Sequence, residues 1–349
     1  MTLGFETAEE IGIHPITLPT GFPVGPVNSY LIEDDPLTLV DAGPNSATTF
    51  EALEDGLAAL GHRVRDVGLI LITHQHLDHT GLVGTLARRS GAEVAALDLL
   101  QPWLADYERA MSRQQRYTDE IMGANGVPRD IRLVVRAIGR RTRVSGAPAT
   151  VTMPLAPDAQ LRLRDRTLTV LHRPGHSPSD TVYFDADRRT MIAGDHLLRH
   201  ISSNPVISTP LAGELYPRPQ TLVTYIASMR ATAREPAKLV LTGHGQPIHD
   251  HRGLISRRLT MHQQRCDHLY DLIAERPYSA YELALELWGD EAPKQAALTI
   301  SEVLGHVDIL LNDGRVAETT GPEGTIRFVA AERLSGNPSV TTPGTRSRA

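Results

Sequence analysis

Three histidines and an aspartate lie within seven consecutive positions, in the segment THQHLDH at residues 73–79. The imidazoles of His74, His76 and His79 and the carboxylate of Asp78 are all common ligands of Zn²⁺. A single histidine after a strand is more often an ordinary polar loop residue. Four such side chains in one short stretch instead favour a metal site.

Further ligand-type residues follow other apolar segments. His176 comes after LTVLHRPG, Asp195 ends TMIAGD, and His244 follows KLVLTG. Rigid strands can bring such side chains together at one edge of a sheet. The whole set of five histidines and two aspartates is large enough for two ions. Nitrogen and oxygen donors without a thiolate suit Zn²⁺ in an open catalytic site, with Mn²⁺ and Fe²⁺ as alternatives.

The elements that must position these residues alternate between strands and helices. The helix at 46–61 is amphipathic and begins with Ser46 as its N-cap. The apolar run at 67–73 is typical of a strand that is buried on both faces, and it leads directly into the histidine cluster. Further strands are expected at 11–18, 27–34, 37–43, 93–97, 160–171, 181–195 and 238–245, and further helices at 80–89 and 219–233.

Two regions depart from this alternation. Residues 98–145 read as an insertion of two consecutive helices, the second with Pro128 in its first turn. Beyond residue 250, three helices and a hairpin follow one another, which is typical of a winged-helix domain. We therefore predict a catalytic domain at 1–250, a winged-helix-like domain at 251–335 and a disordered tail at 336–349.

Composition limits the kinds of protein this can be. The net charge of −6 argues against a dedicated nucleic-acid binder. The single Cys266 excludes an intramolecular disulfide and suits a reducing compartment. The acidic N-terminus has no signal-peptide pattern, and no apolar stretch approaches the roughly 18 residues of a membrane span. We expect a cytoplasmic protein that does not use a membrane.

The order of these motifs resembles that of the metallo-β-lactamase superfamily. His-x-His-x-Asp-His comes first, then a histidine after a strand, then Gly-Asp, then Gly-His, over about residues 11–250. The resemblance implies an α/β fold, an αβ/βα sandwich, here with a helical insertion and a C-terminal winged-helix-like domain. That last domain looks like the one in a subfamily that includes a mitochondrial endoribonuclease and fungal polyketide thioesterases.

The resemblance also implies a role for each residue. His74, His76 and His176 would hold a first metal, and Asp78, His79 and His244 a second, with Asp195 bridging the two. Asp41, in LVDAG, would support the ligands from behind. Asp78 and Asp195 would be the catalytic carboxylates. A hydroxide between two metals about 3.5–4 Å apart is a nucleophile at neutral pH.

The motifs do not select a substrate, because the superfamily includes lactamases, lactonases, thioesterases, nucleases and iron oxygenases. The insertion is apolar on one face, so we predict a lid that offers an acyl chain a slot beside the metals. The leading hypothesis is a dinuclear-zinc hydrolase of a thioester, ester or lactone. The alternatives are a phosphodiesterase or endoribonuclease, an iron-dependent oxygenase, and a metal-bound regulatory protein. Candidate substrate contacts are Trp103, Tyr107, His196, Arg199 and His200.

Two further features bear on partners. Arg136, Arg140, Arg141 and Arg143 either end a solvated helix or clamp an anion. A recognition helix that carries Glu302 and Asp308 would repel phosphates, which disfavours nucleic acid. We therefore expect the C-terminal domain to serve packing or homodimerisation, and the substrate to be a small acyl molecule.

Overall fold

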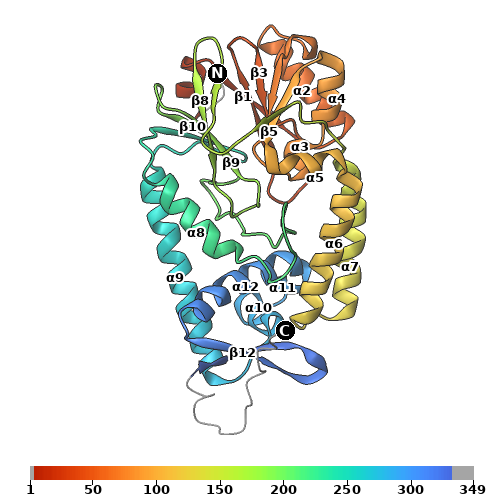
Figure 1. Cartoon of the computed structure of the whole chain (residues 1–349), viewed down its shortest axis with the longest axis vertical. Helices are drawn as coiled ribbons and strands as arrows, with labels where there is room; N and C mark the ends of the chain where they lie inside the picture. Colours follow the sequence, from red (N-terminus) through yellow and green to blue (C-terminus); the bar gives the residue numbers. More distant parts are fainter. Residues whose placement is uncertain (1–3, 332–349) are drawn as a thin grey trace, which may run out of the picture.

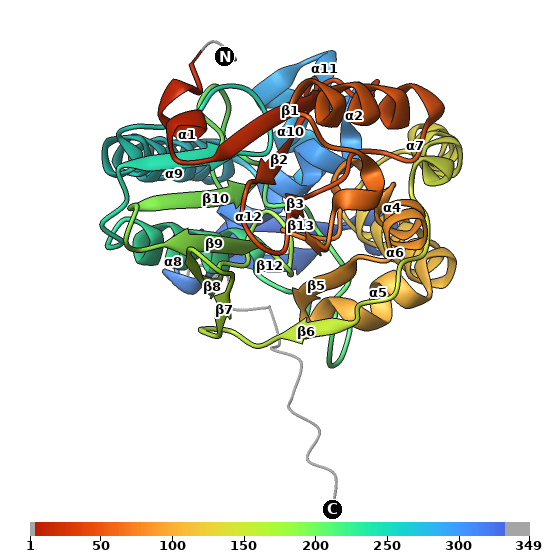
Figure 2. The ribbon, with the colours of Figure 1, turned by 90° about the horizontal axis from the view of Figure 1, so that it is seen from above.

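Two β-sheets lie together at one end of the molecule (Figures 1 and 2), in a computed structural model that describes residues 4–331. One sheet has the strand order β1-β2-β3-β4-β5-β6 and the other β11-β10-β9-β8-β7. The strands of the first are Ile13–Leu18, Val27–Ile32, Thr38–Val40, Leu69–Leu71, Glu93–Leu97 and Met153–Leu155. Those of the second, from β7 to β11, are Gln160–Arg162, Thr167–His172, Thr181–Asp185, Thr190–Gly194 and Leu239–Thr242.

The two sheets share one apolar core. Tyr30 and Val40 from the first sheet pack in the same cluster as Tyr183 and Leu241 from the second. Every residue of β2, β3 and β4 is buried. For β4 this confirms the prediction made from the apolar run at 67–73. From β3 to β6 the strands run parallel, so the carboxyl ends of β3, β4 and β5 lie at one edge.

Helices cover the outer face of each sheet. On the first sheet lie α2 (Ala47–Ala59) and α4 (Val83–Ser90), and on the second lies α8 (Thr221–Thr232). Ser46 caps α2 by accepting from Thr49 N, which confirms the predicted start of that helix. The helix–sheet–sheet–helix order is the predicted αβ/βα sandwich.

The insertion differs from its prediction in detail. The first expected helix breaks at Asp106 into α5 (Gln101–Ala105) and α6 (Tyr107–Ala124). The second, α7 (Arg129–Thr142), takes Pro128 as its N-cap rather than in its first turn. Figure 1 shows α6 and α7 running side by side from the sandwich to the C-terminal helices.

The C-terminal part contains the expected three helices and hairpin. These are α9 (His251–Glu275), α10 (Ala280–Trp288) and α12 (Ala296–Asn312), with a short α11 (Glu291–Lys294) and strands β12 (Val316–Thr320) and β13 (Ile326–Ala330). Ser279 and Glu282 form a capping box at the start of α10, a pattern that their spacing in the sequence already indicates. The assignment as a winged helix stays a prediction, and the tail at 336–349 lies outside the described residues.

Two cores meet along α9. Leu254 and Ile255 in its first turns pack with the second sheet, whereas Cys266 and Leu269 belong to the C-terminal core. The boundary expected at residue 250 therefore marks the start of a helix that joins both parts. Across residues 4–331, no helix is both long and apolar enough to cross a membrane.

Candidate metal centre

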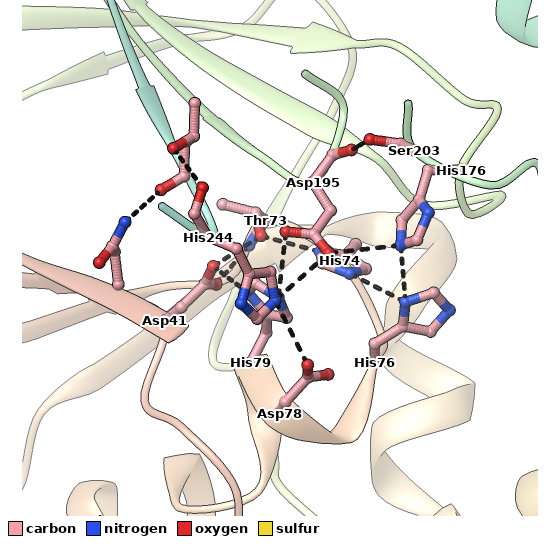
Figure 3. A network of polar contacts seen from close by, with 12 residues as sticks. Asp41, Thr73, His74, His76, Asp78, His79, His176, Asp195, Ser203 and His244 are labelled. Carbon is pink, nitrogen blue, oxygen red and sulfur yellow. Dashed lines mark hydrogen bonds and ion pairs between the residues drawn. The ribbon is translucent and has the colours of Figure 1, made fainter. Parts of the chain in front are cut away.

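The histidine cluster follows β4 and continues into a short helix. His74 and His76 lie on the extended segment after β4, and Asp78 and His79 lie on α3 (Leu77–Thr80). The turn from strand to helix sends the two pairs in different directions, as Figure 3 shows. One short stretch thus supplies ligands to two neighbouring positions.

The structure brings all seven predicted ligands together, from segments far apart in the sequence. Three groups have ligand atoms that all lie within 4.8 Å of one another, namely His74 with His76 and His176, His74 with His79 and Asp195, and Asp78 with His79 and His244. In the first group, His76 Nδ1 lies 3.1 Å from His74 Nε2 and 2.9 Å from His176 Nε2. Two of these groups contain the residues that the family resemblance implied for each metal, and the third links them through His74, His79 and Asp195.

Asp195 lies between the two sites (Figure 3). Its Oδ1 is 3.5 Å from His79 Nε2. Its Oδ2 is 3.6 Å from His176 Nε2 and 3.5 Å from His244 Nε2. One carboxylate therefore faces histidines of both groups.

Four of the histidines form a hydrogen bond through Nδ1, on the side of the ring away from the candidate metal position. The acceptor is Asp41 Oδ2 for His79, at 2.7 Å, and Thr73 Oγ1 for His74, at 3.0 Å. Backbone carbonyls serve the other two, with Pro26 O at 2.7 Å from His244 Nδ1 and Asn204 O at 2.9 Å from His176 Nδ1. A proton fixed on Nδ1 leaves the Nε2 lone pair free for a metal.

Close backbone approach shapes the centre. Asp41 has a φ of 58°, and its carboxylate accepts from Thr73 N at 2.9 Å and from Thr73 Oγ1 at 2.7 Å. Gly194 has a φ of 48°, and a Cβ there would lie 2.6 Å from Thr73 Oγ1. A Cβ at Gly243 would overlap Asp195 Oδ1. The glycines beside Asp195 and His244 are therefore required by space.

The donor atoms fit a cation. His79 Nε2, His244 Nε2 and Asp195 Oδ1 are buried and have no hydrogen-bond partner within the described residues. Such groups are costly unless something pairs with them. Imidazole nitrogens and carboxylate oxygens are the usual donors to zinc and similar divalent ions.

Electrostatics distinguish the two groups. Burial and the neighbouring His79 lower the pKa of His74, and burial and His176 lower that of His76 to about 3, so both imidazoles are neutral. Burial also opposes charge on His79, but the carboxylates of Asp195 and Asp41 outweigh it and raise that pKa. A metal bound beside Asp195 would therefore displace protons.

The predicted substrate contacts lie in different places. His196 points away into the helix layer, since its Nε2 is 2.8 Å from Thr232 Oγ1 of α8, so its prediction is wrong. Trp103 packs in the core of the first sheet, and Tyr107 donates to Arg143 O, so neither offers a surface to substrate. His200 is exposed and lies against Gly245, next to a ligand, and Arg199 is exposed on the same loop.

The expectation of an apolar slot under the insertion is also wrong. Tyr117, Ile121 and Met122 are buried in the C-terminal core, so the apolar face of α6 is already covered. Glu302 and Asp308 are likewise buried, in ion pairs with Arg265 and Arg218, rather than exposed on a recognition helix. These pairs hold α12 in place and do not shape its surface charge.

A second histidine–carboxylate group lies away from this centre. The ligand atoms of His262, Glu302 and His306 lie within 4.8 Å of one another. However, His262 Nδ1 and His306 Nε2 bond to each other at 3.0 Å, and Arg265 already neutralises Glu302. These bonds make the group a packing contact between α9 and α12, with His262 Nε2 the one ring nitrogen of the pair that lacks a partner within the described residues.

Sequence reasoning did not identify Asn204 or Pro26. Both act through a backbone carbonyl, which leaves no side-chain signal. Thr73, inside the quoted segment, was also passed over, although a hydroxyl beside a ligand histidine is a recognisable support.

Comparisons with known proteins agree with this geometry. The family model for the metallo-beta-lactamase superfamily matches residues 22–244. The probable metallo-hydrolase YqjP of Bacillus subtilis is 31% identical over 91% of this chain and 98% of its own length. An atrochrysone carboxyl ACP thioesterase of Pseudocercospora fijiensis is 25% identical over 80% of this chain and 67% of its own length.

A solved structure resembles most of this fold. The crystal structure of a metallo-beta-lactamase family protein from Thermus thermophilus has a TM-score of 0.77, with 27% identity over 91% of this chain and 98% of that one. The motifs, the converging ligands and these similarities lead to one conclusion. The chain belongs to the metallo-beta-lactamase superfamily and is a metal-dependent hydrolase.

Proposed function

We propose that this hydrolase holds two zinc ions and cleaves a thioester, ester or lactone. The observation that carries the metal count is Asp195, whose carboxylate lies 3.6 Å from His176 of the first group and 3.5 Å from both His79 and His244 of the second. A carboxylate in that position can serve two ions at once. The groups His74–His76–His176 and Asp78–His79–His244 would complete one ion each.

Two ions held there would supply an activated water at neutral pH and polarise the attacked carbonyl. The protein's own groups fix the geometry. Asp41 and Thr73 orient His79 and His74, so their Nε2 atoms point inward. Asp78 is more exposed than Asp195, with 14% of its side chain accessible against 7%. We assign to Asp78 the transfer of a proton from the attacking water to the leaving group.

Two observations support an acyl substrate. One is the similarity to a protein named as an ACP thioesterase, which spans most of the chain. The other is an apolar side chain beside the site. Leu298 is 41% exposed, and its carbonyl accepts from Asn204, whose own carbonyl bonds His176. Exposed Ile201, directly after His200, adds a second apolar group on the neighbouring loop.

The arginines of α7 favour a second candidate, a phosphodiester. Arg140 and Arg141 are exposed, whereas Arg143 is paired with Glu108. Two free guanidinium groups suit an anion, and that anion is either the phosphate part of an acyl-coenzyme A or a nucleic-acid backbone. The low aromatic content of 5% and the net charge of −6 weigh against RNA.

The test is a parallel assay of metal-replete protein on a medium-chain thioester, an ester, a lactone and single-stranded RNA. We expect turnover of an acyl substrate with weak salt dependence, because apolar contacts are barely screened. His76→Ala should abolish it, and His249→Ala, at an exposed histidine past the site, should not. RNA cleavage that His76→Ala removes, without acyl turnover, would reverse the ranking.

Metal analysis tests the other half of the proposal. Protein purified without chelator should contain about two zinc ions per chain, as a dinuclear site requires. Asp195→Ala should lower this content, because no neighbouring group can replace a ligand shared by two ions. Full metal content in that variant would contradict the bridging role.

A further inference from the structure

Residues 203–209, here called the strap, form a segment without helix or strand that crosses beside the metal centre. Five of its seven residues are buried, namely Ser203, Pro205, Ile207, Ser208 and Thr209. Irregular segments normally run over the surface, because buried backbone groups need partners. The partners of the strap show what it connects.

On its inner side the strap contacts two metal ligands. Ser203 Oγ donates to the backbone carbonyl of Asp195 at 2.6 Å. The next residue, Asn204, offers its carbonyl to His176 Nδ1 at 2.9 Å. Adjacent residues of the strap thus hold the backbone of Asp195 and the ring of His176, as Figure 3 shows for Ser203.

On its outer side the strap is held by α12. Asn204 Nδ2 donates to Leu298 O at 3.0 Å and lies 3.5 Å from Glu302 Oε2. Ile207 N donates to Ser301 Oγ at 3.1 Å, and the Ile207 side chain is buried in the C-terminal core. The strap is therefore packed into a part of the protein that carries none of the seven predicted metal ligands.

The inserted helix α6 holds the strap from another direction. Gln114 Nε2 donates to Ile207 O at 2.9 Å, and Gln114 Oε1 accepts from Thr209 N at 2.7 Å. A single amide side chain thus pairs with the backbone on both sides of Ser208, in the manner of a neighbouring strand. Two elements distant in sequence converge on the same few residues.

The other ligand histidines are supported differently. His74, His79 and His244 bond to Thr73, Asp41 and Pro26, all within the sandwich. His176 bonds to a carbonyl whose position depends on α6 and α12. Of these four ligand histidines, only His176 is thus tied to the helical parts of the molecule.

We propose that the strap makes Gln114 and Ser301 positioning residues of the metal centre, so that the insertion and the C-terminal helices set the affinity of the first metal group. The inference rests on the proposed two-metal site. It gives the C-terminal domain a role in metal binding, in place of a separate partner-binding role. Loss of either contact should let Asn204 O drift from His176 and leave the second group intact.

The test compares Gln114→Ala and Ser301→Ala with Gln115→Ala. Gln115 is a matched control, because it is the next residue of α6 and its amide donates to Arg136 O of α7 instead of to the strap. In competition titrations of zinc against a chelator, both strap variants should bind one equivalent about 10- to 100-fold more weakly, the usual range for losing support behind a ligand. The other equivalent and the control should match wild type.

A second readout needs no metal. The Nδ1 proton of His176, followed by ¹⁵N-edited NMR of the metal-free chain, should exchange with water faster in both strap variants than in wild type and Gln115→Ala. Gln114→Glu, which retains the acceptor for Thr209 N, should fall between. Unchanged exchange, or equal weakening of both zinc equivalents, would overturn the role of the strap. A wild-type chain that binds one zinc would instead contradict the two-metal proposal, with the exchange data still deciding on the strap.

Discussion

Replacing Asp41 by asparagine tests whether the support behind the metal ligands matters as the geometry indicates. Asp41 is 2% exposed and accepts three hydrogen bonds, from Thr73 N, Thr73 Oγ1 and His79 Nδ1. Asparagine has nearly the same shape and tolerates the positive φ of 58° at this position. The change therefore isolates the loss of one acceptor oxygen and of the negative charge.

The size of the effect follows from the donors left behind. One amide oxygen cannot serve three buried donors, so about two of them lose their acceptor, at about 1–3 kcal/mol each. The Thr73 hydroxyl can turn and accept from the new amide, which places the total at about 2–4 kcal/mol. That is less than the usual stability of about 5–15 kcal/mol, so the variant should fold. Metal affinity should fall about 10- to 100-fold, because His79 loses its fixed orientation.

The assay is a chelator-competition titration with a melting curve, run beside Asp34→Asn. Asp34 is also a buried aspartate, and its carboxylate accepts from three donors, Asp35 N, Asp165 N and Arg166 Nε. It precedes β3, at the opposite end of the strand from Asp41, and contacts no predicted metal ligand. Asp34→Asn should lower the melting temperature at least as much without changing metal affinity. Equal metal affinity in Asp41→Asn and wild type, or equal weakening in both variants, would refute the reasoning.

Further predictions concern metal removal, pH and the core. Stripping the metals with a chelator should lower the melting temperature, because the ions bind the native state preferentially; no change after verified removal would count against a site shared by all seven ligands. Between pH 7 and 5 the metal-loaded protein should lose stability, because burial lowers the pKa of His196, His262 and His306 to about 3, 4 and 3. Below the unfolded pKa of about 6.5 the unfolded chain takes up protons on these histidines and the folded chain does not, so the free energy of unfolding falls as pH falls toward the folded values. His262→Gln removes one such histidine, so the slope of the free energy of unfolding against pH should decrease by about 1.4 kcal/mol per pH unit. Met122→Ala should cost about 2–5 kcal/mol in chemical denaturation because Met122 is 1% exposed, whereas Val134→Ala, at a residue 59% exposed, should cost little.

The ligands could be predicted because each is a distinctive side chain at a strand end. The sequence alone is enough to recognise the motifs His-x-His-x-Asp-His, Gly-Asp and Gly-His, whatever residues pack around them. The caps at Ser46 and Ser279 were equally local, since their partners lie three residues away. Information within a few positions of a residue was therefore sufficient for the sandwich and the metal centre.

The failures share the opposite property. The apolar face of α6 was visible, but its partners lie in α9 and α12, so the sequence did not indicate which core it joins. Glu302 and Asp308 resembled exposed acids because Arg265 and Arg218 are 37 and 90 residues away. Asn204 acts through its carbonyl, which every residue possesses. Contacts between residues far apart in the sequence cannot be predicted from a local sequence pattern.

The shared core of α6 and the C-terminal helices also affects how the chain is made. Met122 and Cys266 pack in the same cluster, and 144 residues separate them along the chain. At a synthesis rate of about 5–20 residues per second, α6 waits roughly 7–30 s on the ribosome before its partner has been synthesised. During that time the nascent sandwich carries an uncovered apolar helix. A chain that stops before α9 and α12 therefore keeps an exposed apolar surface of the kind that aggregates or binds chaperones.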